Sequence, residues 1–391
     1  MRRSGKRYRL LQEMGHLTQA GISTEQMCYF NFEDDCLAPI THVMGDEVLE
    51  TFFYLHPDAL DEGAYLFLGE LQELEGWGCW LRRVVDTCKA TIYVMGSSSK
   101  MLSAEISTEL RGRVLDFELL PYSFGEYLRA HETLGLVPGK QGIVNSHATG
   151  VLVRRRALFD SYLDGGGFPA TLGLPSRQAT MLLQSYVQRV IARDVIERHD
   201  LARPQVVTSP VRRVLSANGK VLSMRNVEAS LRGLGMRLSC EYFADVLGYL
   251  QEAYLIFSVR EFSYALSEKS TSQLKVYAVD SVLALANAKA NSLELGQRLE
   301  NVVYLELRHR HPGARHDEIS RLHTKEHGWE VDFVVGDVVE QEPFQLVQVC
   351  ANADDEVTLR RELRSLWEGM GEGDLREGLR VVGDGSAMTY E

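Results

Sequence analysis

This 391-residue chain has no excess of basic residues, no closely paired cysteines and no long apolar run. The formal net charge is −12, which argues against broad, non-specific binding to nucleic acid, although an acidic protein can still present one basic face. The six cysteines are spread widely and form no C-x-x-C pair: Cys28, Cys36, Cys79, Cys88, Cys240 and Cys350. This usage is typical of reduced thiols in a cytosolic protein rather than of a disulfide framework.

No apolar run is long enough to cross a bilayer. The basic start is followed by LLQEMGHLTQAG, which lacks the apolar stretch of a signal peptide. Hydrophobic residues make up 45% of the chain and charged residues 25%, as in an ordinary soluble globular protein. The length exceeds what one compact core holds, so we predict two or three domains. The unpaired cysteines and the lack of a signal peptide or a membrane-spanning run favour a cytoplasmic protein.

Four short apolar runs mark the first third of the chain, at residues 27–32, 64–71, 91–96 and 114–120. Runs rich in branched and aromatic residues, separated by helical patterns, indicate a largely parallel sheet buried on both faces. The helical pattern between the second and third runs places five apolar side chains on one side: Trp77, Trp80, Leu81, Val84 and Val85. We predict an α/β domain over roughly residues 1–155.

The pattern is mainly helical from residue 156 to about 270. Ser239 is a predicted N-cap, and the helix after it carries an apolar stripe of Phe243, Val246, Leu247 and Leu250. Two strand-like runs follow, separated by the polar stretch 267–273. Two helices and a two-stranded wing outline a winged helix, a module that binds DNA in some proteins and connects proteins in others; we favour a connector or lid.

The last part of the chain, residues 275–391, returns to a mixed α/β pattern. The runs WEVDFVV and FQLVQVC are predicted to be adjacent strands, and DEVTLRRELRSLWEGM an amphipathic helix. Five histidines fall in one polar stretch that we predict to be a solvated loop rather than a metal site, because no strand or helix spacing fixes them: His309, His311, His316, His323 and His327.

The opening RRSGKR resembles the second half of a phosphate-binding loop, G-x-x-x-x-G-K-[ST], ending at Gly5 and Lys6. Arg7 stands where that loop has Ser or Thr, and the loop's first glycine would precede Met1. A basic tail that resembles such a loop by chance is the alternative.

Two predicted strands end in polar groups. Glu70 follows the second run, with Gly69 where many nucleotide hydrolases have an aspartate in the Mg²⁺ shell. Ser97 and Ser98 follow the third run, at the strand edge where open α/β sheets bind ligands. Taken alone, the serines are more simply explained as turn residues.

Six segments in a fixed order make these pieces specific: RRSGKRYRLLQEM, YFNFEDDCL, YLFLGELQELEGW, YVMGSSSKMLSAEISTELRGRVLDFELLPYSFGEYL, DGGGFPA and the strand-rich C-terminal part. Their order resembles a prokaryotic family of AAA-type P-loop ATPases with a C-terminal domain of unknown function. The resemblance implies an α/β P-loop core of AAA/RecA-like type, a helical lid and winged-helix segment, and a degenerate PD-(D/E)xK nuclease-like fold. The corresponding domains are residues 1–155, 156–274 and 275–391.

The resemblance also implies roles for single residues. Gly5 and Lys6 match the end of the Walker A loop, which holds the phosphates of ATP. Glu70 matches the water-orienting glutamate, and Ser97 or Ser98 matches the sensor position.

Arg111 and Arg113, in LRGRV, match arginines that can reach the γ-phosphate in the same or a neighbouring subunit of a homo-oligomer. A structural salt bridge is the equally weighted alternative for both.

Two departures from the family pattern weaken the predicted Mg²⁺ site. Arg7 replaces the hydroxyl ligand and Gly69 replaces the aspartate. An arginine 4 Å from a divalent ion would cost about 8 kcal/mol at an effective dielectric of about 20, so we expect Arg7 to turn away and Mg²⁺ to be poorly held. We also expect the parallel sheet to lack its first strand, as in a copy that is truncated at its start or decaying.

In the C-terminal domain, Asp332 and Gln348 fit two positions of a PD-(D/E)xK site. Cys350 stands where that site has lysine, and a neutral thiol cannot replace the charge. We therefore predict an inherited scaffold rather than an active nuclease.

We predict an ATP-binding protein of the AAA-type ATPase family with impaired hydrolysis and an unknown client protein. Whether this copy is an enzyme is left open. The alternative is a non-enzymatic protein- or DNA-interaction module built on an inactive ATPase. ATP affinity that depends on Lys6 would favour the first function, and steeply salt-dependent DNA binding would favour a nucleic-acid role.

Overall fold

The computed structural model describes residues 4–34, 36, 40–96, 110, 113–115, 117–133, 149–201, 204–223, 227–228, 239–262, 274–288, 294–311, 318–336, 345–351, 356–373, 378–382 and 387–390. Its contacts divide the chain into two compact units, Met1–Leu119 and Leu120–Glu391. The expected domain limits near residues 155 and 274 both fall inside the second unit, so the three-domain division stays a prediction. Within the described residues, no helix has the length and apolar character needed to cross a membrane.

The first unit is built on a parallel sheet of order β1-β2-β3, with β1 at Met27–Asn31, β2 at Ala64–Gly69 and β3 at Ala90–Met95. Leu66, Phe67 and Leu68 of the central strand are fully buried, which explains the unbroken apolar run of β2. The first three expected strands, and the α/β class, are confirmed.

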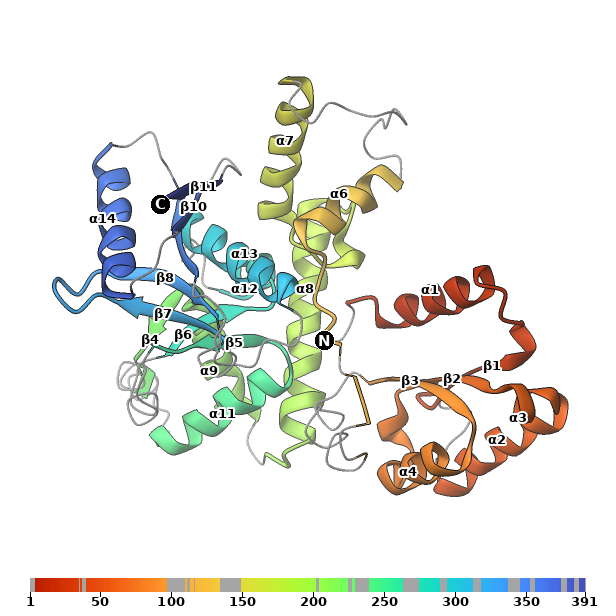
Figure 1. The fold of residues 1–391 in the computed structure, drawn as a ribbon. Helices are drawn as coiled ribbons and strands as arrows, with labels where there is room; N and C mark the ends of the chain where they lie inside the picture. The colour runs from red at the N-terminus through yellow and green to blue at the C-terminus, as the bar shows by residue number, and fades with distance from the viewer. Residues whose placement is uncertain are drawn as a thin grey trace. The chain divides into compact units, whose positions relative to one another are not determined.

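Helices cover both faces of this sheet (Figure 1). One face packs on α1, where Leu10 contacts the cluster of Met27 and Phe67. The other face packs on α2 and α4, and Trp80, Leu81 and Val84 of α4 are buried there, as the helical pattern predicted. The helices of this unit are α1 (Lys6–Gln19), α2 (His42–Leu55), α3 (Asp58–Glu62) and α4 (Trp77–Thr87), with short 3₁₀ turns η1 (Thr24–Gln26) and η3 (Leu71–Glu73).

The fourth expected strand, over residues 114–120, is wrong: the described residues of this run form no strand. Leu115 and Phe117 are 82% and 80% exposed. A strand is fixed to a sheet by the side chains that it buries, and these two side chains bury almost nothing.

The second unit begins with helices α6 (Phe124–Thr133), α7 (Thr149–Gly165) and α8 (Ser176–Val190). A 3₁₀ turn, η5 (Pro169–Thr171), precedes α8; a π-helical turn, η6 (Ile191–Glu197), continues it, and α9 (Pro204–Ser216) follows.

The glycine run in DGGGFPA has a structural reason. Gly166 has a φ of 77°, and a Cβ on it would lie 2.7 Å from Oδ1 of Asp280. Gly167 donates its N–H to Oδ2 of Asp280 at 2.7 Å, and a Cβ on it would lie 2.4 Å from the carbonyl oxygen of Tyr122. Only glycine allows this close approach of backbone to carboxylate.

A three-stranded antiparallel sheet of order β4-β6-β5 follows α9. Ser239 caps α11 by accepting the N–H of Tyr242 at 3.1 Å, and the predicted apolar stripe of that helix is buried. The cap, the helix and the strands β5 and β6 are confirmed, whereas the sequence analysis missed β4. The bounds are β4 (Lys220–Leu222), α11 (Cys240–Glu252), β5 (Ile256–Val259) and β6 (Leu274–Ala278).

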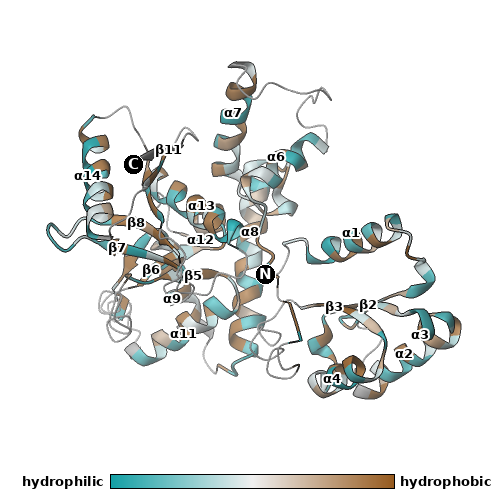
Figure 2. Ribbon diagram, viewed as in Figure 1, coloured by the Kyte–Doolittle hydropathy of each residue, from teal (hydrophilic) through white to brown (hydrophobic). Residues whose placement is uncertain are grey.

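The chain ends in a five-stranded sheet of order β11-β10-β9-β8-β7. β8 and β9 are antiparallel neighbours, as predicted, and α14 packs against them. Leu366 and Met370 of α14 are buried against these strands while Arg360 and Arg361 are exposed, which confirms the amphipathic pattern, and Figure 2 shows both hydrophobic and hydrophilic residues on this helix. The bounds are α12 (Ser281–Asn287), α13 (Leu295–Arg310), β7 (Ile319–His323), β8 (Glu330–Val335), β9 (Gln345–Cys350), α14 (Glu356–Gly373), β10 (Gly378–Val382) and β11 (Ala387–Tyr390).

Candidate functional site

Lys6 and Glu70 lie at the same edge of the parallel sheet of the first unit. The Nζ atom of Lys6 donates to the carbonyl oxygen of Gly96 at 2.6 Å, and Gly96 directly follows β3. Glu70 directly follows β2 and donates its N–H to the carbonyl oxygen of Met95 at 2.6 Å. Because parallel strands end at one edge, the lysine and the glutamate meet where open α/β sheets bind ligands.

The start of α1 adds a second feature to this edge. Gly5 precedes the helix in the left-handed region, with φ 94° and ψ 12°, a conformation that favours glycine. The first N–H groups of a helix have no partner inside the helix and carry the positive end of its dipole. Together with the ammonium of Lys6, they form a set of donors suited to phosphate oxygens.

Glu70 is held in an unusual backbone conformation. It has φ 49° and ψ 42°, although it is not glycine, and its side chain is buried. Its Oε2 accepts a hydrogen bond from Nε2 of Gln72 at 2.6 Å. Left-handed backbone at such a residue costs on the order of 1–3 kcal/mol and concentrates at functional sites. The sequence analysis missed Gln72, which lies two positions after the glutamate.

Asn31 occupies the space that an aspartate at position 69 would need. A Cβ on Gly69 would lie 2.8 Å from Oδ1 of Asn31 and 3.3 Å from Cε of Met95. Asn31 ends β1 and pairs in register with Gly69. Its Oδ1 is buried and has no hydrogen-bond partner among the described residues. The sequence analysis missed Asn31, and the available signal was a polar residue at the end of the first apolar run.

Arg7 is exposed, and its Cζ lies 5.9 Å from the centre of the Tyr29 ring. Tyr29 belongs to the sheet face that α1 covers. The charge of Arg7 is thus held beside an aromatic ring of β1, in a cation–π arrangement.

The remaining predicted residues of the site are not gathered here. Ser97, Ser98 and Arg111 lie outside the described residues. Arg113 forms an exposed ion pair with Asp86, with 2.7 Å between Nη1 and Oδ1. Asp86 lies in the last turn of α4, just before β3 begins, so this pair is near the amino edge of the sheet, opposite to Glu70.

The donor set of this edge fits a triphosphate better than a metal ion. The edge carries the ammonium of Lys6 and the first backbone N–H groups of α1. For Mg²⁺ the edge offers the carboxylate of Glu70, but position 7 has no hydroxyl and position 69 has no side chain.

The second unit brings Asp332 and Gln348 together, because they lie on the neighbouring strands β8 and β9. Oδ2 of Asp332 accepts the N–H of Val349 at 2.8 Å, and the N–H of Asp332 donates to Oε1 of Gln348 at 3.3 Å. Nε2 of Gln348 donates to Glu362 of α14 at 2.5 Å. Cys350, at the end of β9, is 1% exposed.

A lysine from another sheet lies among these groups, and the sequence analysis missed it. Nζ of Lys275, in β6, is 2.5 Å from Oε1 of Glu300, 2.9 Å from Oε1 of Glu330 and 3.6 Å from Oδ1 of Asp332. Burial alone would lower the pKa of Lys275, but the three carboxylates together raise it above its usual range.

The pKa values of the carboxylates in this cluster are shifted in different directions. Burial and repulsion from Glu300 hold the pKa of Asp332 well above its ordinary value, although Lys275 opposes the shift. Burial also raises the pKa of Glu300. For Glu330, burial is outweighed by Lys275 and Arg321, so its pKa is lowered.

The five histidines do not form one loop, so that part of the prediction is wrong. His309 lies in the last turn of α13 and binds the carbonyl oxygen of Leu305, whereas His323 ends β7 and contacts Glu261. His316 lies outside the described residues. The helix and the strand separate side chains that the polar composition had grouped.

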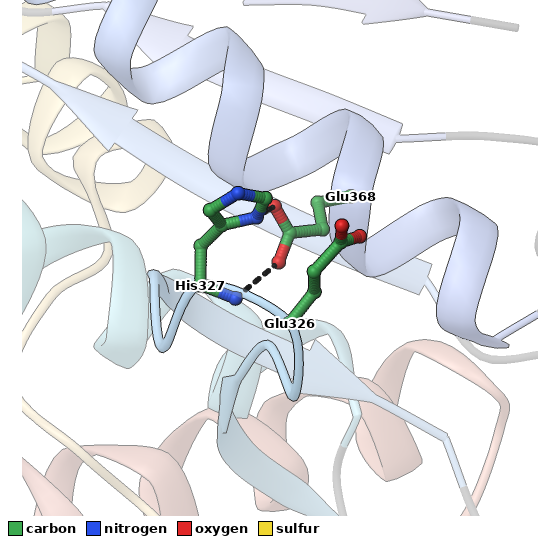
Figure 3. Close-up of side chains that lie close together, drawn as sticks. All are labelled: Glu326, His327 and Glu368. Atoms are coloured by element: carbon green, nitrogen blue, oxygen red, sulfur yellow. Dashed lines mark hydrogen bonds and ion pairs between the residues drawn. The ribbon is translucent and has the colours of Figure 1, made fainter.

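His327 lies close to Glu326 and Glu368, and their potential ligand atoms are within 4.8 Å of one another (Figure 3). Glu368 accepts both the N–H and the Nδ1–H of His327, at 3.1 and 2.8 Å. Glu372 accepts the N–H of Lys325 at 2.6 Å. Carboxylates of α14 therefore bind the turn at Lys325–His327 through hydrogen bonds. These hydrogen bonds explain why the three side chains lie close together, and no metal ion is needed for that.

Two parts of the chain match known domain families, and two known proteins resemble most of its length. Residues 1–128 match a family model described as an AAA domain, and residues 156–294 match a domain of unknown function, DUF8612. An uncharacterised protein of Methanocaldococcus jannaschii is 29% identical over 366 residues, which cover 93% of this chain and 76% of that protein. An uncharacterised protein of Haemophilus influenzae is 23% identical over 334 residues, covering 85% and 77%.

Two solved structures are also similar. A Walker-type ATPase of Pyrococcus abyssi has 13% identity and a TM-score of 0.46, covering 73% of this chain and 89% of that one. The ORC1 protein of Aeropyrum pernix, in complex with DNA, has 16% identity and a TM-score of 0.29, covering 72% and 82%. The match of residues 1–128 to an AAA domain agrees with the parallel sheet and the donors at its carboxyl edge, and residues 156–294 match a separate domain of unknown function.

Proposed function

We propose that the first unit binds a nucleoside triphosphate at the carboxyl edge of its parallel sheet and hydrolyses it slowly or not at all. The contact between Lys6 and Gly96 carries this proposal, because it brings the lysine next to the strand whose last residue binds the N–H of Glu70. Lys6 and the start of α1 would bind the β- and γ-phosphates, and Glu70 would orient water.

Weak Mg²⁺ binding is the reason to expect slow turnover. In P-loop enzymes a hydroxyl after the lysine and an aspartate at the end of the central strand hold the metal. This chain has Arg7 and Gly69 at those positions. Ser97, Ser98 and Arg111 stay predicted contributors to the same edge, and Arg113 stays a predicted contributor to a neighbouring subunit of a homo-oligomer.

The test is nucleotide binding by the full chain, measured by calorimetry with ATP in the presence and absence of Mg²⁺. Lys6→Ala should lower ATP affinity at least tenfold, since a lost charge-assisted contact to phosphate costs about 1.5–3 kcal/mol. Lys89→Ala is the matched control, because Lys89 also donates to a backbone carbonyl, of Asp61 at 2.6 Å, but beside the amino edge of β3. Equal affinities in the two variants, or no binding at millimolar ATP, would overturn the proposal.

The second unit favours a protein client over DNA. The order α9, β4, α11, β5, β6, with sheet order β4-β6-β5, supports the proposed winged-helix segment. Its α11 has the sequence CEYFADVLGYLQE, which contains three carboxylates and no lysine or arginine. A helix of this charge repels the phosphates of DNA. We infer that the winged-helix segment is a connector to a client protein, in a cytoplasmic setting that suits the free thiols Cys28 and Cys36.

The last part of the chain supports the inference of an inherited nuclease-like scaffold. A helix, three antiparallel strands, a second helix and a strand parallel to the third follow one another as α13, β7, β8, β9, α14 and β10. In this proposal Asp332 on β8 and Gln348 on β9 correspond to two positions of a PD-(D/E)xK site. The buried thiol of Cys350 supplies no positive charge at the third.

A further inference from the structure

Glu300, Glu330 and Asp332 form a buried carboxylate cluster around the ammonium of Lys275. We propose that this cluster is a cation site that the chain fills with its own Lys275, and that the site accepts a divalent metal ion only when this ammonium is removed. The inference concerns the second unit alone and does not depend on nucleotide binding.

The geometry is that of a cation surrounded by ligands. Nζ of Lys275 lies 2.5, 2.9 and 3.6 Å from carboxylate oxygens of Glu300, Glu330 and Asp332. These residues come from three elements, α13 and β8 on one side and β6 on the other, so the ammonium joins a strand of the β4-β6-β5 sheet to a helix and a strand of the last part of the chain.

The cluster is largely shielded from solvent, with Glu330 at its rim 35% exposed. The side chain of Lys275 is 6% exposed, and those of Glu300 and Asp332 are 12% exposed each. Buried ammonium and carboxylate groups are stable only when they are paired and further hydrogen-bonded. A hydrated metal ion has no room to share this space with the lysine.

Neighbouring donors fix the direction of two of the carboxylates. Oδ2 of Asp332 accepts the N–H of Val349 at 2.8 Å. Glu300 accepts the hydroxyl of Tyr277, which is fully buried. Such outer contacts orient carboxylates around metal ions in proteins, and oxygen ligands of this kind suit hard divalent cations.

Charge explains why removal of the lysine would open the site. One ammonium faces three carboxylates. The guanidinium of Arg321 lies 3.7 Å from Glu330 and also 3.7 Å from Glu261. Without Lys275 the negative charge of the cluster would lose its nearest compensating cation. Protons or a bound divalent cation are the two ways to neutralise this charge.

The test uses the full-length Lys275→Met variant and Mn²⁺ alone as the probe. Methionine keeps the length of the side chain and removes its charge. We expect its melting temperature to fall by about 10 °C without metal, as for a broken buried ion pair. We expect Mn²⁺ to restore much of this loss, with one additional ion bound per chain by electron paramagnetic resonance.

The wild type and Lys220→Met provide the controls. Lys220 is an exposed lysine in the neighbouring strand β4, and neither protein should gain the additional Mn²⁺ ion, although both keep the exposed group of Glu326, His327 and Glu368. Adding Asp332→Asn to Lys275→Met should abolish the gain.

Three outcomes would overturn the proposal. Mn²⁺ binding by the wild type that Asp332→Asn removes would show that the lysine does not fill the site. A folded Lys275→Met that binds no additional Mn²⁺ would show that the cluster is not a cation site. If Lys275→Met does not fold alone, recovery of the folded protein with Mn²⁺ supports the proposal, and failure of Mn²⁺ to restore folding contradicts it.

Discussion

At the scale of single residues, the proposed nucleotide site of the first unit depends on which atoms lie where the sequence analysis expects Mg²⁺ ligands, at positions 7 and 69. Gly69 removes an expected carboxylate, but the structure adds that Asn31 fills the space beside it. The loss of the aspartate and the placement of the asparagine amide are therefore coupled. A single substitution at position 69 cannot rebuild the metal site.

We predict that Gly69→Asp destabilises the first unit by about 1–3 kcal/mol, because the new side chain would overpack against Asn31. Asn31→Ala/Gly69→Asp should recover most of this loss. It should also make ATP affinity more dependent on Mg²⁺, by on the order of tenfold for one charge-assisted contact. Urea unfolding and calorimetric titration of ATP with and without Mg²⁺ measure the two effects.

Asn31→Ala alone is the control, and it should leave the Mg²⁺ dependence unchanged. A fully stable Gly69→Asp single variant would show that Asn31 does not restrict position 69.

At the scale of elements, the charge of α11 distinguishes between DNA binding and protein binding by the proposed winged-helix segment. In α11 the residues Glu241 and Asp245 are exposed, whereas Phe243 and Val246 pack into the core. Topology alone is shared by DNA-binding and protein-binding modules, so the exposed face must decide between them.

We predict that the full chain shows no steeply salt-dependent affinity for duplex DNA, measured by fluorescence anisotropy between about 50 and 200 mM salt. Glu241→Lys/Asp245→Lys reverses the charge of the α11 face and should create weak, salt-dependent binding. Glu241→Gln/Asp245→Gln is the neutral control and should bind less than the lysine variant. Tight binding by the wild type that the lysine substitutions leave unchanged would place a DNA site elsewhere and contradict the connector function.

At the scale of the whole molecule, the two units place their important charges differently. The first unit gathers donors at the carboxyl edge of its sheet, where we propose that a nucleotide binds. The second unit gathers carboxylates in its interior, where Lys275 compensates them. The stability of the second unit should therefore depend on pH through the buried cluster.

The sign follows from the direction of the pKa shifts. Asp332 and Glu300 have raised pKa values in the folded state, so between their ordinary values of 3.8 and 4.5 and the raised values the folded chain binds more protons than the unfolded chain. Their contribution to stability is present at low pH and is lost as the pH rises through that window.

We predict that the transition of the second unit moves to lower temperature as the pH rises above the ordinary carboxyl values of 3.8 and 4.5, measured by differential scanning calorimetry. Asp332→Asn should weaken this dependence, because the amide does not ionise. ATP should raise the transition of the first unit and leave that of the second unchanged, which assigns the two transitions. A pH dependence that is the same with and without Asp332→Asn would contradict the raised pKa of Asp332.

The sequence predicted elements well where a local pattern defines them. The runs at β1, β2 and β3, the stripe of α4 and the cap at Ser239 are all visible within short windows, because periodic burial and capping act over a few residues. The run at residues 114–120 shows the limit of this argument. Its composition is that of a strand, but Leu115 and Phe117 are exposed, and burial depends on the rest of the chain.

By itself the sequence determined that this chain has a parallel α/β unit with Gly5, Lys6 and Glu70 at strand and helix ends, followed by helices and a second mixed part. Parallel strands end at the same edge of a sheet. Residues that directly follow such strands are therefore expected to lie near one another, and the apolar runs in the sequence already mark where the strands end. Only the tertiary structure decided that Asn31 fills the space beside Gly69, and that Lys275 neutralises Glu300, Glu330 and Asp332. These contacts join distant elements, and no local periodicity encodes the packing that brings such side chains together.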